Sequence, residues 1–189
     1  MRQTKRDELV RKATDIFYRN GFQASGMDML VAETGISKTS IYKHFKTKEE
    51  LILATLKLRD EHIRGWLFRR MQELAGTPRE QLIAMFDALE EWFSEPDFRG
   101  CMFAKATSEY QDVDHPINRQ AAEHVEKLTG KIRELAEQAG LPDPATLARR
   151  LTLLKEGAVV LAMLGHTSSP ARDAKAVAVR LLSEPAAPS

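Results

Sequence analysis

The sequence has little cysteine, no long apolar run and no large excess of either charge sign. Its single cysteine among 189 residues, Cys101, excludes an intrachain disulfide and is typical of a reducing compartment. The longest apolar run covers the nine residues from Gly157 to Gly165, well short of the roughly 18–20 that span a bilayer. The first residues are charged and precede no apolar signal-peptide core. These absences predict a soluble cytoplasmic protein and argue against secretion, membrane spanning and a disulfide scaffold.

The sequence motifs of common enzyme classes are also missing. There is no P-loop, no G-x-S-x-G, no glycine fingerprint for dinucleotides and no H-E-x-x-H. Glu109, His115 and His124 lack the close spacing that is typical of metal ligands. The sequence therefore predicts a protein that is not an enzyme and has neither a metal site nor a cofactor.

Charge is nearly balanced over the whole chain but unevenly distributed along it. The formal net charge is +1, yet the first 50 residues contain ten Lys and Arg against seven Asp and Glu. Residues 37–48 contain four lysines and no acidic residue. A basic cluster on a near-neutral chain predicts a polyanionic partner at this end, with a solvated helix face as the alternative.

Apolar residues recur at helical spacing along most of the chain, and no alternating strand pattern spans even five residues. Capping residues and helix-opening prolines mark the expected starts of helices. These starts are Ser25, Ser37, Thr47, Thr77, Pro116, Asp143 and Ser169, after a first helix over residues 6–20. The helix that begins at Thr47 is expected to run toward Glu73, and the tail over residues 184–189 to be frayed. The sequence thus predicts an all-α fold of about nine helices.

Two brief helices joined by residues 34–37 have the length of a helix-turn-helix, and the glycine and serine in this turn are typical residues for ending one helix and starting the next. In the second helix, Ile41 and Phe45 are four residues apart and should share the inward face. The other positions have side chains that can donate hydrogen bonds to phosphates and base edges. These are Lys38, Thr39, Ser40, Tyr42, Lys43 and His44.

The stretch over residues 21–51 resembles the TetR family of bacterial transcriptional regulators. The family pattern is approximately G-[FY]-x-x-T-T-x-x-x-[IL]-A-x-x-[AT]-G-[VI]-S-x-x-x-[IL]-Y-x-[HY]-F-x-x-K-x-x-L, and this chain matches it in order and spacing. Gly26 departs from the pattern where a second threonine is usual, and Val31 where alanine is usual. Because Gly26 lacks a hydroxyl, Ser25 is expected both to cap the helix and to contact phosphate.

The resemblance implies a homodimer that binds a near-palindromic double-stranded DNA operator. It implies a helix-turn-helix DNA-binding domain over residues 1–50 and an effector-binding and dimerisation domain over residues 51–189. It further implies that ligand binding changes the spacing of the two DNA-binding domains. The predicted function is a repressor that a small effector releases from DNA, and the aromatic and sulfur-containing residues of the chain favour a hydrophobic or aromatic effector. The residues expected to face DNA are Ser25, Met27, Lys38, Thr39, Ser40, Tyr42, Lys43, His44 and Lys48. Tyr42 and Lys48 are the expected phosphate ligands, Lys48 because it lies in a first helical turn; a purely structural Tyr42 is the alternative.

The helix expected over residues 144–165 is apolar on all sides, so both of its faces must be covered. The helix that follows has one apolar stripe. Two such helices from each of two chains would form a four-helix bundle, where the resemblance also puts the dimer interface. An ordinary monomer core is the alternative. The predicted interface residues are Leu151, Leu154, Ala158, Leu161, Ala162, Gly165, Ala176 and Val179.

Aromatic and sulfur-containing residues are frequent between Trp66 and Tyr110, where an ordinary core is the alternative to a ligand pocket. A regulator of this family needs an effector cavity among its central helices. The predicted lining is Trp66, Met85, Phe86, Leu89, Phe93, Cys101, Phe103, Glu109, Tyr110, His124, Met163 and His166. Because Cys101 lies just before an expected helix, where a thiol is more reactive, a sensor of electrophiles or oxidants is a second hypothesis for the function. A helical interaction protein without a DNA role is the third.

Overall fold

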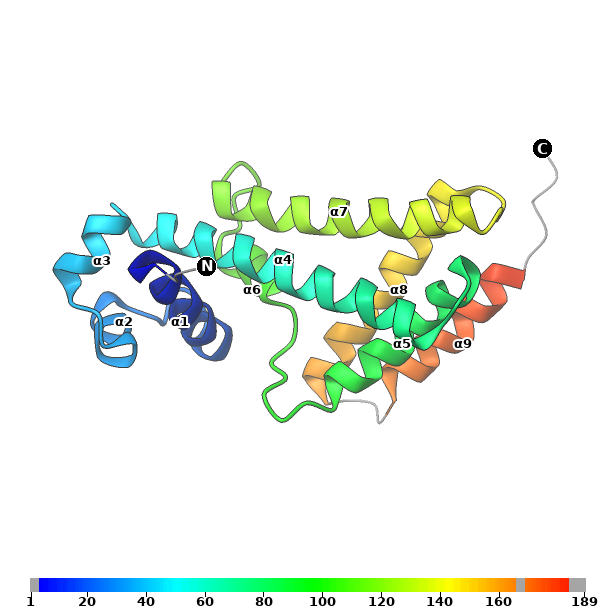
Figure 1. Ribbon diagram of the computed structural model, residues 1–189, viewed down its shortest axis with the longest axis horizontal. Coiled ribbons are helices and arrows are strands. Elements are labelled where there is room, and N and C mark those ends of the chain that lie inside the picture. The colour runs from blue at the N-terminus through cyan, green and yellow to red at the C-terminus, as the bar shows by residue number, and fades with distance from the viewer. Residues whose placement is uncertain (1–3, 166–168, 184–189) are drawn as a thin grey trace. The chain divides into compact units, whose positions relative to one another are not determined.

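The computed structural model describes residues 4–165 and 169–183. Within these two ranges the chain forms nine helices and no strand, which confirms the all-α prediction (Figure 1). The helices are α1 (Lys5–Asn20), α2 (Met27–Thr34), α3 (Lys38–His44), α4 (Lys48–Leu74), α5 (Pro78–Phe93), α6 (Met102–Glu109), α7 (Pro116–Gln138), α8 (Pro144–Leu164) and α9 (Pro170–Ser183). The predicted frayed tail lies outside the described residues.

Most helices begin at the capping motifs that the sequence indicated. At the start of α5, Thr77 and Glu80 form a complete capping box, and Pro78 between them is the first residue of the helix. At the start of α4, the Thr47 hydroxyl accepts from the Glu50 N–H at 3.1 Å. The Glu50 carboxylate accepts from the Lys46 N–H at 2.6 Å, one residue earlier than in a standard box. Local hydrogen bonding therefore determines where these helices start.

The predicted cap of α2 is wrong. The N-cap residue is Gly26, and no side chain caps this helix. Ser25 is fully buried, and its hydroxyl donates to the Gly21 carbonyl at 2.6 Å. A serine hydroxyl readily bonds to a backbone group of its own turn, and here that bond replaces the cap.

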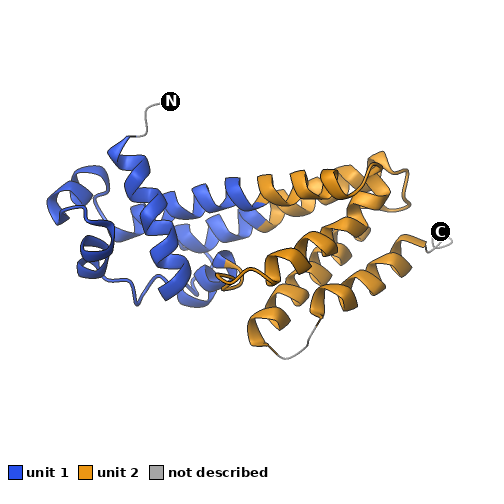
Figure 2. Ribbon diagram, turned by 60° about the horizontal axis from the view of Figure 1, so that its bottom comes forward, with its two compact units in different colours: residues 1–63, 102–124 blue, residues 64–101, 125–189 orange. Residues whose placement is uncertain are grey.

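The chain divides into two compact units (Figure 2). Unit 1 comprises residues 1–63 and 102–124, and therefore contains α1, α2, α3, α6 and the first parts of α4 and α7. Unit 2 comprises residues 64–101 and 125–189, with α5, α8, α9 and the remaining parts of α4 and α7. The functional boundary expected at residue 50 stays a prediction, since these units are divided by compactness.

Each unit has its own apolar core. In unit 1 the rings of Phe17 and Phe22 are fully buried and lie 5.4 Å apart between centroids. In unit 2 the side chains of Met71, Leu82 and Met85 are fully buried. In the part of the chain that the structure describes, no helix is both long enough and apolar enough to cross a membrane.

Candidate nucleic-acid interface

The turn between α2 and α3 is fixed by three local features. Gly35 ends α2 in the left-handed conformation (φ 69°), which favours glycine. The Thr34 hydroxyl accepts from the Ile36 N–H at 3.1 Å. The Ser37 hydroxyl accepts from the Ser40 N–H at 3.3 Å and caps α3. Together these contacts set the direction in which α3 leaves the turn.

Helix α3 has one buried and one exposed side, as its sequence predicts. Ile41 and Phe45 are 1% and 4% exposed, which confirms that they share the inward face. On the other side Tyr42 is 46% exposed. The remaining predicted DNA contacts of this helix are exposed (Lys38, Thr39, Lys43) or half-buried (Ser40, His44). The seven-residue helix thus has hydrogen-bond donors on its solvent side, while Ile41 and Phe45 anchor its other side in the core.

Helix α1 holds α2 in place through two polar contacts. The Lys12 ammonium donates to the Thr34 carbonyl at 2.7 Å, at the C-terminal end of α2. Arg19 and Glu33 form an ion pair at 2.6 Å. The Lys12 contact satisfies a carbonyl that the helix end leaves without an intrahelical partner. Helices α1 and α2 are therefore connected by polar contacts as well as by packing.

The start of α2 differs from what the sequence predicts for DNA contact. Ser25 is 0% exposed, so its side chain does not reach the surface and the assignment of Ser25 to DNA is corrected. Met27 is half-buried in the first turn. Next to it, Asp28 forms an exposed ion pair with Lys38 of α3 at 3.6 Å. Pairs exposed to this degree contribute little to stability.

The predicted phosphate ligand Lys48 has a protein partner. Its ammonium donates to the Phe22 carbonyl at 2.8 Å, in the turn between α1 and α2. The side chain is half-buried. Lys48 therefore stabilises the turn, and only its remaining N–H groups are available to a phosphate.

Glu109, predicted to line a pocket, also binds this turn. Its two carboxylate oxygens accept from the Phe22 N–H at 3.0 Å and the Gln23 N–H at 2.5 Å. The residues are 86 and 87 positions apart in sequence, so no local pattern could indicate the contact. The structure thus places the Glu109 carboxylate on the backbone of the turn that leads into the helix-turn-helix.

Two family descriptions match this chain. Residues 9–55 match "Bacterial regulatory proteins, tetR family", and residues 78–178 match "Tetracyclin repressor-like, C-terminal domain". Together they extend over the helix-turn-helix and most of the helices that follow. The chain belongs to the TetR family of bacterial transcriptional regulators.

Solved structures agree with this TetR-family assignment. SCO4454, a TetR-family transcriptional regulator from Streptomyces coelicolor, is 30% identical, with a TM-score of 0.85 over 95% of this chain and 90% of its own. The reduced form of NemR from Escherichia coli is 20% identical, with a TM-score of 0.84 over 96% of this chain and 98% of its own, and supports the fold alone.

Curated relatives of this TetR-family chain include proteins named for both senses of regulation. The transcriptional regulator YjdC from Escherichia coli is 21% identical over 94% of this chain and 93% of its own length. The activator FasR from Mycolicibacterium smegmatis is 34% identical over 52% of this chain and 44% of its own. The repressor KstR2 from the same species is 33% identical over 45% and 41%.

The helices α8 and α9 pack side by side in unit 2 (Figure 1). Both have exposed apolar side chains. On α8, Leu153, Val160 and Leu164 are 73%, 46% and 69% exposed. Their spacing of seven and four residues puts them on one helical face. On α9, Val177 and Val179 are 45% and 41% exposed. These five residues of unit 2 are together called the α8–α9 face; Val177 and Val179, two positions apart, lie on different sides of α9.

Two of the predicted interface residues are on the wrong side of α8. Leu151 and Ala158 are 0% and 3% exposed and belong to the core of this chain. Both faces of α8 contain apolar residues. The face with Leu151 and Ala158 is the one buried against the other helices of unit 2. Of the other predicted residues, Leu154 and Ala162 are half-buried, and Leu161, Gly165, Ala176 and Val179 are exposed.

The residues predicted for an effector pocket fall in both units. Trp66, Met85, Phe86, Leu89, Phe93, Cys101 and Met163 belong to unit 2, and Phe103, Glu109, Tyr110 and His124 to unit 1. His166 lies outside the described residues. The Cys101 side chain is buried. Met163 covers Gly100, where an added Cβ would lie 2.0 Å from the methionine sulfur.

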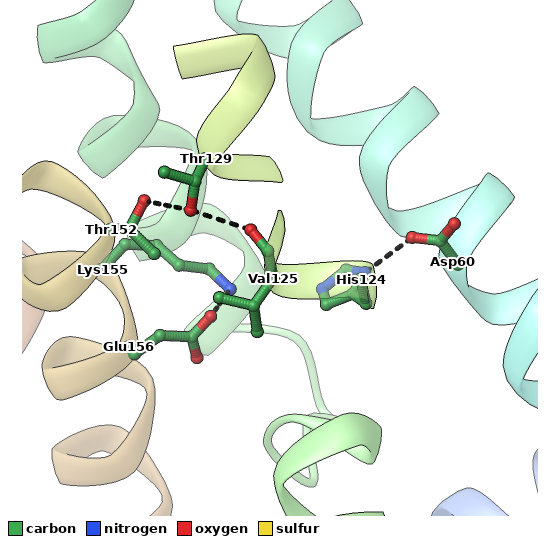
Figure 3. Close-up of polar contacts among 7 residues, drawn as sticks. All are labelled: Asp60, His124, Val125, Thr129, Thr152, Lys155 and Glu156. Carbon is green, nitrogen blue, oxygen red and sulfur yellow. Dashed lines mark hydrogen bonds and ion pairs between the residues drawn. The ribbon is translucent and has the colours of Figure 1, made fainter. Parts of the chain in front are cut away.

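His124 has a buried acidic partner that the sequence did not reveal. Its Nδ1 lies 2.7 Å from an Asp60 carboxylate oxygen (Figure 3). Both side chains are at most 4% exposed. The Phe103 ring stacks on the imidazole, with centroids 3.7 Å apart and planes at 6°. Removing one member of such a pair would leave a buried polar group without its partner, which is strongly destabilising.

Unit 2 contains a second polar cluster, between α7 and α8. The Thr129 hydroxyl contacts the Val125 carbonyl at 2.8 Å and the Thr152 hydroxyl at 3.0 Å (Figure 3). Beside it is a groove of about 380 Å³. Its lining residues are Val125, Glu126, Thr129, Gly130, Arg133, Ala145, Ala148 and Arg149.

Proposed function

We propose that this chain is a homodimeric repressor that binds a near-palindromic operator through α3 of each protomer. The single observation that supports it best is the two-sided α3, with Ile41 and Phe45 buried and Tyr42 and Lys43 exposed. A helix of this length fits the major groove with its N-terminal part toward the bases. Lysine and tyrosine side chains then bind phosphates and so fix the position of the helix along the DNA.

The α8–α9 face supports the homodimer. An apolar surface that one chain leaves exposed is buried when the same surface of a second chain covers it about a two-fold axis. Two copies of α3 would then contact two half-sites one helical turn of DNA apart, on the order of 34 Å. The near-palindromic operator follows from this symmetry.

The proposed effector is a small, hydrophobic or aromatic molecule. Met85, Phe86 and Leu89 are buried side chains on α5, the apolar type that lines such cavities. An effector that favours the arrangement unable to bind DNA must itself be bound less tightly when operator is present. Cys101 is a weaker alternative, because a thiol that is 7% exposed is poorly accessible to reagents. A regulator of this kind acts in the bacterial cytoplasm, where its DNA is.

The test is DNA binding by variants of α3 with a matched control. Replacing Lys38 and Lys43 together by alanine should lower affinity for the operator by at least about a hundredfold at low salt and reduce the salt slope by about two. Lys57→Ala, at an exposed lysine of α4, is the control and should leave both quantities unchanged. Equal binding by all three proteins would refute the proposed role of α3.

A further inference from the structure

The turn between α1 and α2 is held mainly by side chains from distant helices. This turn, residues 21–26, has consecutive N–H groups at Phe22 and Gln23, both of which donate to Glu109 of α6. The carbonyl of Phe22 accepts from Lys48 of α4. The Phe22 ring is fully buried and lies 6.4 Å from the Tyr110 ring, edge on. All of these residues belong to unit 1.

The Glu109 carboxylate matches this turn closely. Two adjacent N–H groups that point in one direction form an anion-binding concavity, and hydrogen bonds to a charged acceptor are stronger than neutral ones. Gly21 makes room for the carboxylate, because an added Cβ would lie 2.9 Å from its nearer oxygen. Gly21 also has φ +83°, a conformation that favours glycine.

A second residue of α6 binds the end of α1. Lys105, one helical turn before Glu109, donates to the Tyr18 carbonyl at 2.9 Å. This carbonyl lies in the last turn of α1, where the helix leaves acceptors without intrahelical partners. The Lys105 ammonium also lies 5.3 Å from the centre of the Tyr18 ring. One side of α6 therefore contacts α1 and the α1–α2 turn, because its carboxylate accepts from backbone N–H groups and its ammonium donates to a backbone carbonyl.

The other end of α6 contacts the buried pair described above. Phe103, in the first turn of α6, stacks on His124, which binds Asp60 of α4. Helix α6 thus connects the Asp60–His124 pair to the turn that leads into α2. Since α2 and α3 follow this turn directly, its conformation sets how they are presented.

We propose that Glu109 is a positioning residue for DNA binding, which holds the α1–α2 turn so that α2 and α3 can bind DNA together. This inference rests on the proposed function. Helix α6 then connects the helices after residue 50 to the DNA-binding helices, in addition to the continuous helix α4. Glu109 acts through the turn and does not itself touch DNA.

The test is Glu109→Gln in the full chain, which replaces one carboxylate oxygen by an NH2 group that donates and cannot accept, and leaves the other as a neutral carbonyl acceptor. Loss of one charge-assisted hydrogen bond should lower the equilibrium constant for holding the turn in its bound conformation by at least about tenfold. We therefore expect operator affinity to fall by about tenfold. A simple charge effect has the opposite sign, because removing an acidic group should favour binding to phosphates. Glu61→Gln, at an exposed position of α4, makes the same charge change away from the turn and should not weaken binding.

Two further measurements separate positioning from general stability. The salt slope of binding should stay at the wild-type value, because Glu109 contacts no phosphate. Amide hydrogen exchange should accelerate at Phe22 and Gln23 and remain unchanged in the core helices. Glu109→Asp, which keeps the charge, should restore part of the affinity and replaces the glutamine variant if that variant fails to fold.

Each outcome decides the inference. Reduced affinity with an unchanged slope and local exchange at the turn supports it. Wild-type affinity in Glu109→Gln, or a loss accompanied by accelerated exchange throughout the chain, overturns it. If the wild type itself binds no operator, the proposed function fails, which is a different result from equal binding by wild type and variant.

Discussion

Replacing Leu153 by glutamate should separate the proposed homodimer into monomers without unfolding either chain. Leu153 is 73% exposed on α8, so the change removes few contacts within one chain, and glutamate is a good helix former. We expect the free energy of unfolding of the monomer to change by at most about 0.5 kcal/mol. The effect on association is much larger.

The size of that effect follows from the symmetry of the interface. Burying a leucine side chain contributes about 1.5–3 kcal/mol, and a two-fold interface contains the residue twice. Burying two carboxylates without partners adds a cost of several kcal/mol. Even about 4 kcal/mol in total would raise the dissociation constant of the dimer roughly a thousandfold.

Sedimentation equilibrium of wild type and variant over a range of concentrations measures this constant. Val113→Glu is the matched control, because Val113 is also 73% exposed but lies in the loop between α6 and α7. We expect Val113→Glu to leave association unchanged. Equal dissociation constants for wild type and Leu153→Glu, or equal losses in both variants, would refute the assignment of the α8–α9 face.

Three other changes have defined outcomes. Ala158→Glu introduces a charge at a position that is 3% exposed within one chain, so thermal melts should show a loss of several kcal/mol in the monomer itself. Tyr42→Phe removes a phenolic donor at an exposed position of α3 and should weaken operator binding by about 0.5–1.5 kcal/mol with an unchanged melting temperature. Burial, with the Glu49 and Glu109 carboxylates, raises the pKa of Tyr110. Its contribution to stability is therefore complete below about pH 10 and lost as pH rises through the raised pKa, and ultraviolet titration of Tyr110→Phe should lack the late-ionising phase.

The helices could be predicted from the sequence because their ends are determined locally. Thr77 and Glu80 form the expected box, and Gly35 ends α2 in the conformation that favours glycine. Ser25 shows the limit of this reasoning, since its hydroxyl bonds to Gly21 and the cap is Gly26. A short polar side chain has several backbone partners within reach, and the pattern of residues does not rank them.

The site could be predicted only where one helix determines it. The inward face of α3 follows from Ile41 and Phe45, four residues apart. By contrast, α8 has apolar residues on both of its sides, and only the packing of unit 2 shows that Ala158 is inside and Leu153 outside. The contact of Glu109 with the α1–α2 turn joins segments more than 80 residues apart, for which one sequence contains no periodic signal.

Selection of bound sequences from random double-stranded DNA, with the full chain as the binding protein, tests most directly whether this chain is a sequence-specific regulator. We expect a near-palindromic sequence to be enriched, with an even number of chains bound per site and affinity that falls steeply with salt. The double replacement of Lys38 and Lys43 by alanine should abolish the enrichment. Recovery of no common sequence by a folded, dimeric protein would contradict the proposed function.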